Sequence, residues 1–363
     1  MHCPECEAFT DFVFPRTDLY LWFPLDHTFA KVSAFLGEAD FDYELLRQDL
    51  VKLSLTETTL NGFLIQLSGV ISSQELAGSK ALTVREGEEP DVRNLERVVT
   101  LEKLVAISHG QWLRELVEQD RYTTYFQPIV SSQDLGVIGH EALFRGFEAD
   151  GSLLSPTHIF KTAAEAGQMF QLDLAARRSA VQQAAKLDVG NQWVFINFNP
   201  TTVYDPSYCL RTTVSACEEL GLKPEQIIFE VTETEKVEDM RHLRGILSFY
   251  RKAGFRVALD DVGAGYSGLN ILQSLGPDLI KIDRHLIENI DTDAFKLNIV
   301  EHLTALAHRQ QIQVLAEGIE TEAEAKTLQE LGVDLLQGYY FGRPGPELVE
   351  KVSVATEPVR ESA

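Results

Sequence analysis

The stretch RVALDDVGAGYSGLN, from Arg256 to Asn270, decides how the rest of the chain is interpreted. It predicts a strand that ends in two adjacent carboxylates, Asp260 and Asp261, and then continues into a glycine-rich loop. Neighbouring aspartates at a strand end repel each other unless a positive charge lies near both of them. An acidic turn and a divalent-metal site both fit this pair, because hard cations bind carboxylate oxygens.

Strand and helix patterns alternate on both sides of this stretch. Eight short apolar runs predict strands, at Tyr125–Val130, Glu141–Arg145, Trp193–Phe198, Ile227–Thr232, Arg256–Val262, Asp278–Asp283, Gln313–Gly318 and Leu335–Phe341. Amphipathic spacing predicts helices between most of them, at Gln171–Leu187, Tyr208–Leu220, Asp239–Lys252, Thr292–Gln311 and Glu322–Leu331. The alternation indicates an α/β fold, and eight such units predict a (β/α)8 TIM-like barrel. A doubly wound open sheet is the alternative that the same alternation permits.

The beginning of the chain has a different pattern and predicts a small N-terminal α+β domain. We expect strands at Leu19–Pro24 and Lys80–Val84, helices at Asp26–Leu36 and Tyr43–Leu53, and either a helix or a buried strand at Leu60–Ile71. The acidic run Arg85–Asp91 is expected to be a linker, and helical spacing resumes from Leu95 with a break at Gly110. We therefore expect a regulatory or sensory domain at 1–95, a helical connector at 96–120, the barrel at 121–346 and a C-terminal tail at 347–363.

The composition is that of a globular chain with a strongly acidic balance. The 363 residues include 32 basic and 55 acidic ones, which gives a formal net charge of −23. This charge argues against nucleic-acid polymers and anionic membranes as partners. An anionic substrate would need metal ions or a few well-placed basic side chains. No apolar run is long enough to cross a bilayer and no secretory signal is visible, so we expect a cytoplasmic protein without a membrane segment.

Four cysteines fit a reducing compartment. Cys3 and Cys6 form a lone CxxC, a spacing that also occurs in zinc sites and redox pairs. Two ordinary thiols are the favoured interpretation, because no second pair of cysteines or histidines follows at ligand spacing.

Polar residues recur at the carboxyl ends of the expected strands, where a barrel gathers them at one mouth. They are Glu141, Arg145, Asn197, Glu230, Asp260, Asp261, Lys281, Glu317 and Gln337. The carboxylates and the asparagine offer only oxygen ligands, which favours Mg²⁺ or Mn²⁺ over zinc or copper. Adjacent aspartates allow one of them to bridge two ions, and such a pair would stabilise both the attacking and the leaving oxygen of a phosphoryl displacement. Lys281 would either hold or deprotonate an attacking water, or be a buried partner for one of the carboxylates.

An ordered series of motifs between residues 120 and 345 resembles the EAL-domain family, the cyclic-di-GMP phosphodiesterases. The naming motif stands at Glu141–Leu143 within EALFRG, and YFQPIV precedes it. INFNP, FEVTE, LDDVGAGYSGL, LIKID, AEGIE and LLQGYYFG follow in the family's order. The resemblance implies hydrolysis of cyclic-di-GMP to linear pGpG with two Mg²⁺ or Mn²⁺ ions, and a homodimer formed through the barrel.

The resemblance also implies roles for individual residues. One metal ion is expected at Glu141, Asn197, Glu230 and Asp260, and a second at Asp260 and Asp261, with Glu317 binding the second ion directly or through water. Lys281 matches a lysine that assists the nucleophilic water, and Gln127, Leu143 and Arg145 match substrate-contacting positions. Gln337 matches a glutamine near the active site, and Glu233 matches a glutamate that steadies the glycine-rich loop.

Three positions depart from the residues that are common in this family. Val262 replaces Phe, Phe144 replaces Leu and Asn199 replaces Ser. None of them is an expected ligand, so an active enzyme is favoured over an inactive relative. The alternative function is a catalytically silent receptor or adaptor that binds cyclic-di-GMP and signals through the N-terminal domain. A diguanylate cyclase is not expected, because the first domain contains no GGDEF-like motif.

Overall fold

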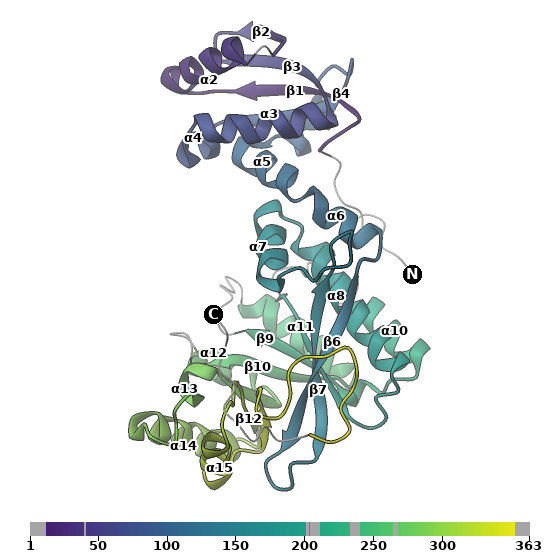
Figure 1. Cartoon of the computed structure of the whole chain (residues 1–363), viewed down its shortest axis with the longest axis vertical. Coiled ribbons are helices and arrows are strands. Elements are labelled where there is room, and N and C mark those ends of the chain that lie inside the picture. The colour runs from purple at the N-terminus through teal and green to yellow at the C-terminus, as the bar shows by residue number, and fades with distance from the viewer. Residues whose placement is uncertain are drawn as a thin grey trace. The chain divides into compact units, whose positions relative to one another are not determined.

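The computed structural model describes residues 12–39, 41–200, 203, 211–232, 240–263 and 268–352 (Figure 1). The chain divides into two compact units. The first unit contains the chain up to Arg121 together with Gly146–Leu172, and the second contains Tyr122–Arg145 together with the residues from Asp173 onward. The domain boundaries expected at 95, 120 and 346 stay predictions.

The first unit contains a five-stranded antiparallel sheet. Its strands are β1 (Arg16–Trp22), β2 (Tyr43–Arg47), β3 (Leu50–Thr56), β4 (Lys80–Arg85) and β5 (Val99–Thr100), in the order β2-β3-β1-β4-β5. Helices α2 (Asp26–Glu38) and α3 (Glu57–Val70) and the short α4 (Ser73–Gly78) accompany the sheet. Figure 1 shows α3 lying along it, and the shared core includes Leu19, Leu21 and Phe63. The strands expected near residues 19 and 80 and the helix expected from Asp26 are confirmed.

The segment Tyr43–Leu53, expected to be a helix, is instead a β-hairpin formed by β2 and β3. Val51, Leu53 and Leu55 are buried at every second position, which is the period of a strand with one buried face. The ambiguous segment that begins at Leu60 is helical and belongs to α3.

The helix expected to resume at Leu95 is also wrong in its first part. The 3-10 helix η1 (Val92–Arg97) is followed by β5, which pairs with β4. Regular α-helix begins only at Leu101, because the backbone of Val99–Thr100 is used by the sheet edge.

Helices α5 (Leu101–His109) and α6 (Gln111–Glu118) meet at Gly110, so the expected break there is confirmed. Helix α7 (Pro156–Ala166) packs against this joint. A Cβ on Gly110 would lie 2.8 Å from the Cβ of Ala166, so only glycine permits this approach. The ring of Trp112 stacks on His158 with 5.1 Å between centroids. These contacts join α5, α6 and α7 in one packed body.

The second unit is a closed barrel of eight strands. In chain order they are β6 (Tyr122–Ser131), β7 (Val137–Gly146), β8 (Trp193–Asn197), β9 (Ile227–Thr232), β10 (Arg256–Val262), β11 (Leu279–Ile282), β12 (Gln313–Ala316) and β13 (Leu335–Gln337). Neighbours around the barrel follow the order β10-β11-β12-β13-β6-β7-β8-β9. The closure confirms the barrel and rules out the open doubly wound sheet. Every expected strand is present, some with shifted ends.

Strand β6 runs against the others. It pairs antiparallel with β13, with Gln337 opposite Ile129, whereas β7 to β13 pair in parallel. A hairpin joins β6 to β7, and in it the N–H of Ser131 donates to the carbonyl of Gly136 at 2.9 Å. A parallel crossover needs a dozen or more residues, and the five residues between these strands cannot supply one. β6 is therefore an antiparallel strand in this barrel, joined to β7 by a hairpin.

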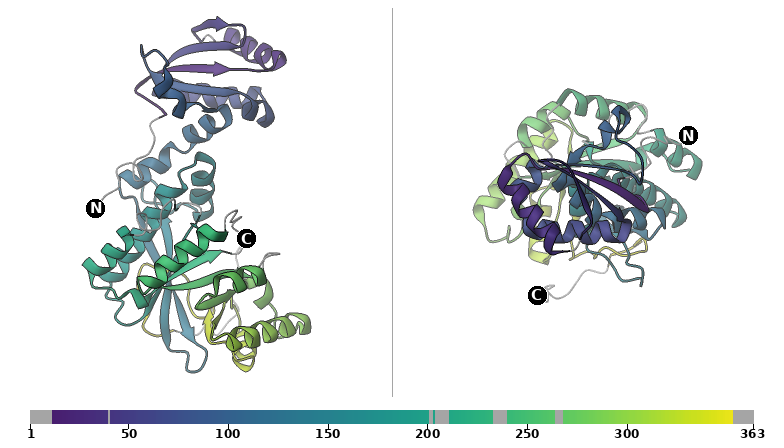
Figure 2. Two further views of the ribbon diagram at one scale, coloured as in Figure 1. Left: turned by 180° about the vertical axis from the view of Figure 1, so that it is seen from behind. Right: turned by 90° about the horizontal axis from the view of Figure 1, so that it is seen from above.

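Helices lie outside the barrel strands (Figures 1 and 2). They are α8 (Met169–Lys186), α10 (Arg211–Leu220), α11 (Met240–Lys252), α12 (Gly268–Leu275), α13 (Arg284–Ile287), α14 (Ala294–Arg309) and α15 (Glu322–Glu330). The interior is filled by a layer with one residue from each of seven strands, which we call the barrel floor: Ile129, Phe195, Ile228, Ala258, Leu279, Leu315 and Leu335. None of the described helices combines the length and the apolar character that crossing a bilayer requires.

Glu75 connects α4 to α2 in the first unit. Its carboxylate accepts hydrogen bonds from the N–H of Ser72 at 2.8 Å, from Lys31 Nζ at 2.9 Å and from Thr28 Oγ1 at 3.0 Å. The Ser72 backbone bond, followed by the Lys31 bond, lowers the pKa of Glu75 from 4.5 to about 2. Since this folded-state pKa is below the usual value, Glu75 stabilises the fold above pH 4.5 and loses that contribution as the pH falls towards 2.

We expect Glu75→Gln to lower the thermal midpoint at pH 7, and the deficit relative to the wild type to shrink at pH 2.5. Circular-dichroism melts at both pH values measure this difference. Glu86→Gln, which removes an exposed carboxylate paired with Arg16, is the control and should change the midpoint little. A deficit of equal size at both pH values would contradict the lowered pKa of Glu75.

Candidate functional site

A ring of polar side chains lies just beyond the barrel floor. On each strand from β8 to β13, the ring residue lies two positions after the floor residue. These ring residues are Asn197, Glu230, Asp260, Lys281, Glu317 and Gln337. On the antiparallel β6 the corresponding position is two residues earlier, at Gln127. Side chains alternate across a strand, so residues two apart point to the same side. This register brings the ring to one end of the barrel, which we call the mouth.

Glu141 on β7 is held in the mouth by two amide side chains. Asn197 Nδ2 donates to Glu141 Oε1 at 3.0 Å, and Gln337 Nε2 donates to Glu141 Oε2 at 2.7 Å. Gln337 Nε2 also lies 3.3 Å from Gln127 Oε1. Four residues far apart in the sequence thus meet in one hydrogen-bonded group that fixes the orientation of the Glu141 carboxylate.

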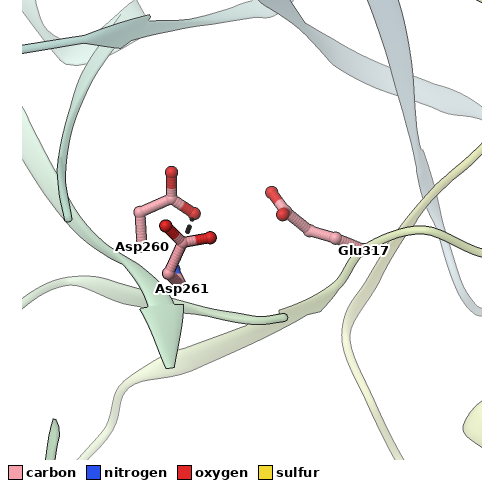
Figure 3. Close-up of side chains that lie close together, drawn as sticks. All are labelled: Asp260, Asp261 and Glu317. Atoms are coloured by element: carbon pink, nitrogen blue, oxygen red, sulfur yellow. Dashed lines mark hydrogen bonds between the residues drawn. The ribbon is translucent and has the colours of Figure 1, made fainter. Parts of the chain in front are cut away.

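Asp260 and Asp261 share one side of β10 because the strand carries a β-bulge. Between Leu259 and Val262, β10 contains one more residue than its partner β11. Asp261 adopts a left-handed backbone conformation with a φ of 56°. Figure 3 shows both carboxylates near each other and opposite Glu317, with the N–H of Asp261 donating to Asp260 Oδ1 at 2.9 Å. In a regular strand, two neighbouring side chains would point to opposite faces.

These three carboxylates have the spacing of a cation site. Asp260, Asp261 and Glu317 each offer an oxygen, and the three oxygens lie within 4.8 Å of one another. Glu230 Oε2 is buried and accepts no hydrogen bond from the described residues, as expected for an oxygen that can bind a cation instead. The donors are all oxygens, so this set fits hard divalent cations.

Lys281 on β11 lies at the centre of the carboxylates. Its Nζ is 2.6 Å from Glu230 Oε1 and 3.2 Å from Asp260 Oδ1, and it also pairs with Glu317. Glu141 Oε2 is 3.9 Å away. Lys281 is 1% exposed and Glu230 is fully buried, so this ammonium is shielded from water. The geometry is that of a buried partner of several carboxylates, and the expected role toward a water molecule stays a prediction.

Burial and mutual repulsion raise the pKa values of the carboxylates. Burial is the largest cause for Glu230 and for Glu317, whose pKa rises to about 8. Burial, followed by repulsion from Asp260, raises the pKa of Asp261 to about 6. Burial alone would lower the pKa of Lys281, but the surrounding carboxylates raise it well above its usual value. One ammonium offsets only part of this negative charge, so the mouth favours additional cations.

Two further expected residues follow Glu141 on the same side of β7. Leu143 is half-buried, and the guanidinium of Arg145 stacks over the ring of Tyr125 at 5.4 Å. Arg145 Nη1 also donates to the carbonyl of Phe144 at 2.8 Å. Tyr125 was not among the expected site residues, although it lies two residues before Gln127 on β6 and the alternation of that strand would have indicated it.

The structure brings together the expected residues on the barrel strands. Glu141, Asn197, Glu230, Asp260, Asp261, Lys281, Glu317, Gln337 and Gln127 line the mouth or adjoin a residue that does. Glu233, Cys3 and Cys6 lie outside the described residues.

The comparison with protein-family models identifies the class to which this barrel belongs. Residues 110–344 match the family described as EAL domain. The match covers well over half of the chain, and the chain therefore belongs to the EAL-domain family. It begins within the connector, at the Gly110 break between α5 and α6.

Individual relatives agree with this membership. The chain is 29% identical over 253 residues to "Cyclic di-GMP phosphodiesterase PdeF" of Escherichia coli K12, covering 69% of this chain but 33% of that protein. A standalone EAL protein from Vibrio cholerae, solved with bound c-di-GMP, is 37% identical with a TM-score of 0.57 and covers 63% of this chain and 95% of its own. A manganese and cyclic-di-GMP complex of Klebsiella pneumoniae BlrP1 is 25% identical, with a TM-score of 0.57 and coverage of 91% and 96%. The chain thus spans about a third of that curated relative, whereas the last alignment extends beyond the EAL-matched residues.

Removing the Lys281 ammonium should destabilise the protein when no divalent cation is present. We expect Lys281→Met to lower the free energy of unfolding by about 3–5 kcal/mol, because the buried carboxylates lose their counter-charge. Urea unfolding at pH 8 in a metal chelator measures the loss. Lys326→Met is the control, since Lys326 pairs with Glu322 on the exposed face of α15. This substitution should change the free energy of unfolding by less than about 0.5 kcal/mol. A Lys281→Met variant as stable as the wild type would contradict the electrostatic account.

Proposed function

We propose that this chain hydrolyses one phosphodiester bond of cyclic-di-GMP to give linear pGpG, with two Mg²⁺ or Mn²⁺ ions. The observation that carries the proposal is the bulged pair Asp260 and Asp261 opposite Glu317, within an oxygen-only ring around Lys281. Membership of the EAL-domain family and relatives named as cyclic di-GMP phosphodiesterases support the reaction. The manganese complex of the BlrP1 protein supports the class of cation.

The residues of the mouth divide into ligands and partners. We assign one cation to Glu141, Asn197, Glu230 and Asp260, and the other to Asp260, Asp261 and Glu317. When bound, such a pair of ions lowers the pKa of water and neutralises charge on the phosphate. The chain itself holds these oxygens close together and limits the electrostatic repulsion between their carboxylates. Lys281 supplies the compensating charge, and the two amides on Glu141 keep its carboxylate oriented.

The displacement itself is a single substitution at phosphorus. Water oxygen forms the new bond to phosphorus, and the bond from phosphorus to the 3′ oxygen breaks in line with it. The proton that the water loses is taken up overall by the 3′ oxygen that leaves. Lys281 Nζ, which contacts Glu230, Asp260 and Glu317, would supply positive charge beside the attacking oxygen. Arg145, held over Tyr125, would neutralise a phosphate oxygen of the bound nucleotide. Leu143 and Gln127 would contact the rest of the substrate.

Glu141→Ala tests this function together with its metal dependence. We expect turnover of cyclic-di-GMP to fall at least about a hundredfold, because even outer partners of metal ligands are worth ten- to a hundredfold. Wild-type turnover should stop in a metal chelator and return with Mg²⁺ or Mn²⁺. Anion-exchange chromatography of the guanine nucleotides measures pGpG formation, and Glu148→Ala, an exposed acid in the loop after β7, is the control.

Two outcomes would overturn parts of this proposal. Full activity of Glu141→Ala would contradict the ligand assignment. Binding of cyclic-di-GMP by the wild type without hydrolysis in either metal would favour the alternative, a silent receptor or adaptor. The homodimer through the barrel, the cytoplasmic location and the absence of a nucleic-acid polymer among the partners remain predictions.

We further propose that the N-terminal domain regulates the barrel through the joint between α5 and α6. A hydrogen-bonded chain connects this joint to α3: Ser108 Oγ donates to Asn61 Oδ1 at 2.6 Å, and Asn61 Nδ2 donates to Gln111 Oε1 at 2.9 Å. Gln111 Nε2 then donates to Glu57. Asn61 and Glu57 belong to α3, which packs on the N-terminal sheet, so a change in that sheet can shift the start of α6.

Helix α6 in turn packs against the end of β7. A Cβ on Gly146 would lie 2.7 Å from Leu116 Cδ1 and 2.9 Å from Ile159 Cδ1, so the backbone of Gly146 is closely packed against both side chains. Gly146 directly follows Arg145, the expected phosphate contact. A movement of α6 would therefore act on the strand end that carries Arg145.

Gln111→Leu should weaken this coupling without unfolding the connector. We expect the KM for cyclic-di-GMP to rise roughly threefold to thirtyfold, the range typical of residues along a coupling network. Steady-state kinetics and the thermal midpoint measure the effect. Gln119→Leu is the matched control, because Gln119 is exposed at the other end of α6 and accepts from Arg121 Nε. Wild-type kinetics in Gln111→Leu would contradict regulation through this joint.

A further inference from the structure

We propose that the buried ion pair of Asp173 and Arg177 is a positioning device that fixes the segment after β8, and through it the amide of Asn197 in the mouth. The inference rests on the proposed function, because Asn197 is one of the assigned metal ligands. It names a pair on α8 that does not itself line the mouth.

The pair lies in an environment where charges are rarely tolerated. Arg177 is fully buried and Asp173 is 5% exposed, although the two are the i and i+4 residues of one helix. Arg177 Nε and Nη2 both contact Asp173 Oδ2, at 2.9 and 2.8 Å. A buried ion pair is often no more stabilising than a pair of apolar side chains of the same size. A gain in stability therefore does not by itself explain why Asp173 and Arg177 form a buried ion pair.

Each member of the pair also makes a contact beyond its own helix. Asp173 Oδ1 accepts a hydrogen bond from the backbone N–H of Asn199 at 3.1 Å. The same carboxylate therefore binds Arg177 through Oδ2 and the segment after β8 through Oδ1. Arg177 Nη1 donates to Thr213 Oγ1 on α10 at 3.2 Å. Its guanidinium also lies 5.7 Å from the centre of the Phe198 ring. The pair thus connects α8, the segment after β8 and α10.

The segment held in this way begins at Asn197. The N–H of Phe198 donates to the carbonyl of Glu230 at 3.0 Å, and Asp173 holds Asn199 one residue later. Hydrogen bonds to β9, its neighbour in the barrel, and to α8 therefore hold the end of β8 in place. The amide nitrogen of Asn197 donates to Glu141, so the amide oxygen of Asn197 is the atom that would bind a cation. A shift of the backbone at 198–199 would move that oxygen away from the other ligands.

The same contact explains why a departure from the family pattern is tolerated. Asn199 stands where the family commonly has Ser, but the bond to Asp173 uses the backbone N–H. Every residue except proline supplies that group. The bond between this position and Asp173 therefore does not depend on which side chain residue 199 carries.

Two double variants of the full-length chain separate positioning from simple stabilisation. Asp173→Asn/Arg177→Met removes both charges but keeps an acceptor for the Asn199 N–H. Asp173→Leu/Arg177→Met has almost the same shape and lacks that acceptor. We expect Mn²⁺ affinity close to that of the wild type in the first variant, and about ten- to a hundredfold weaker in the second. Isothermal titration of the protein with Mn²⁺ alone, without nucleotide, measures both.

Hydrogen exchange of the Asn199 amide in metal-free protein provides an independent measurement. It should be faster than in the wild type only in Asp173→Leu/Arg177→Met. Equal exchange and equal Mn²⁺ affinity in the two double variants would overturn the inference and leave a purely structural pair. If the wild type binds no Mn²⁺, the proposed function fails, whereas exchange at Asn199 still decides whether Asp173 holds this segment.

A control and a fallback complete the test. Asp18 in the N-terminal sheet has a comparable environment, with Lys52 Nζ at 2.9 Å and the N–H of Gly87 at 3.0 Å, but no candidate ligand follows it. Asp18→Leu/Lys52→Met should therefore leave Mn²⁺ affinity unchanged even if it lowers stability. If the leucine variant of the α8 pair does not fold, Asp173→Glu keeps the charge and misplaces the acceptor. Wild-type Mn²⁺ affinity in Asp173→Glu would also overturn the inference.

Discussion

The structure of the mouth depends on one buried ammonium group. Lys281 Nζ contacts Glu230, Asp260 and Glu317, and without it the carboxylates would have no positive partner among the described residues of the ring. Its charge is too small to neutralise them all, and burial together with the remaining repulsion between carboxylates raises the pKa values of Glu230 and Glu317. The protein thus holds an acidic cluster that is stable enough to fold and still short of positive charge. That shortage of positive charge is what the proposed cations, and through them a bound phosphodiester, would offset.

The second constraint is geometric and comes from the alternation of side chains along a strand. On β8 to β13 each ring residue follows a floor residue by two positions, and on the antiparallel β6 it precedes one by two. The packing of apolar residues such as Phe195 and Ile228 therefore also sets the height of Asn197 and Glu230. The bulge in β10 is the single exception to this alternation, and it places two acids where a regular strand would place one. The strand register that buries the apolar floor residues therefore also determines where the expected ligand residues lie.

Much of the second unit could be predicted from the sequence, because its strands are short apolar runs that end in polar residues. The ring residues on β8 to β13 were identified for the same reason, whereas Gln127 was expected only from the resemblance to the EAL-domain family. The direction of β6 was not predicted, since a strand has the same pattern whichever way it runs. The hairpin at Tyr43–Arg47 and Leu50–Thr56 was missed because its first strand is exposed on both faces, so period-two burial appears only in the second. Asp173 and Arg177 could not be recognised, because i and i+4 charges on a helix are ordinarily a solvated pair.

The reversed direction of β6 has a consequence for how such a barrel can be combined with other domains. Because β6 runs away from the mouth, its first residue, Tyr122, lies at the rim, where its ring stacks on Phe144 next to Arg145. In a barrel of eight parallel strands, the first strand would begin at the far end from the mouth. Here any segment fused ahead of Tyr122 is connected to the barrel at the end that carries the mouth. One reversed strand therefore places the amino-terminal connection of the barrel at its mouth, which is where the proposed regulation by a preceding domain would act.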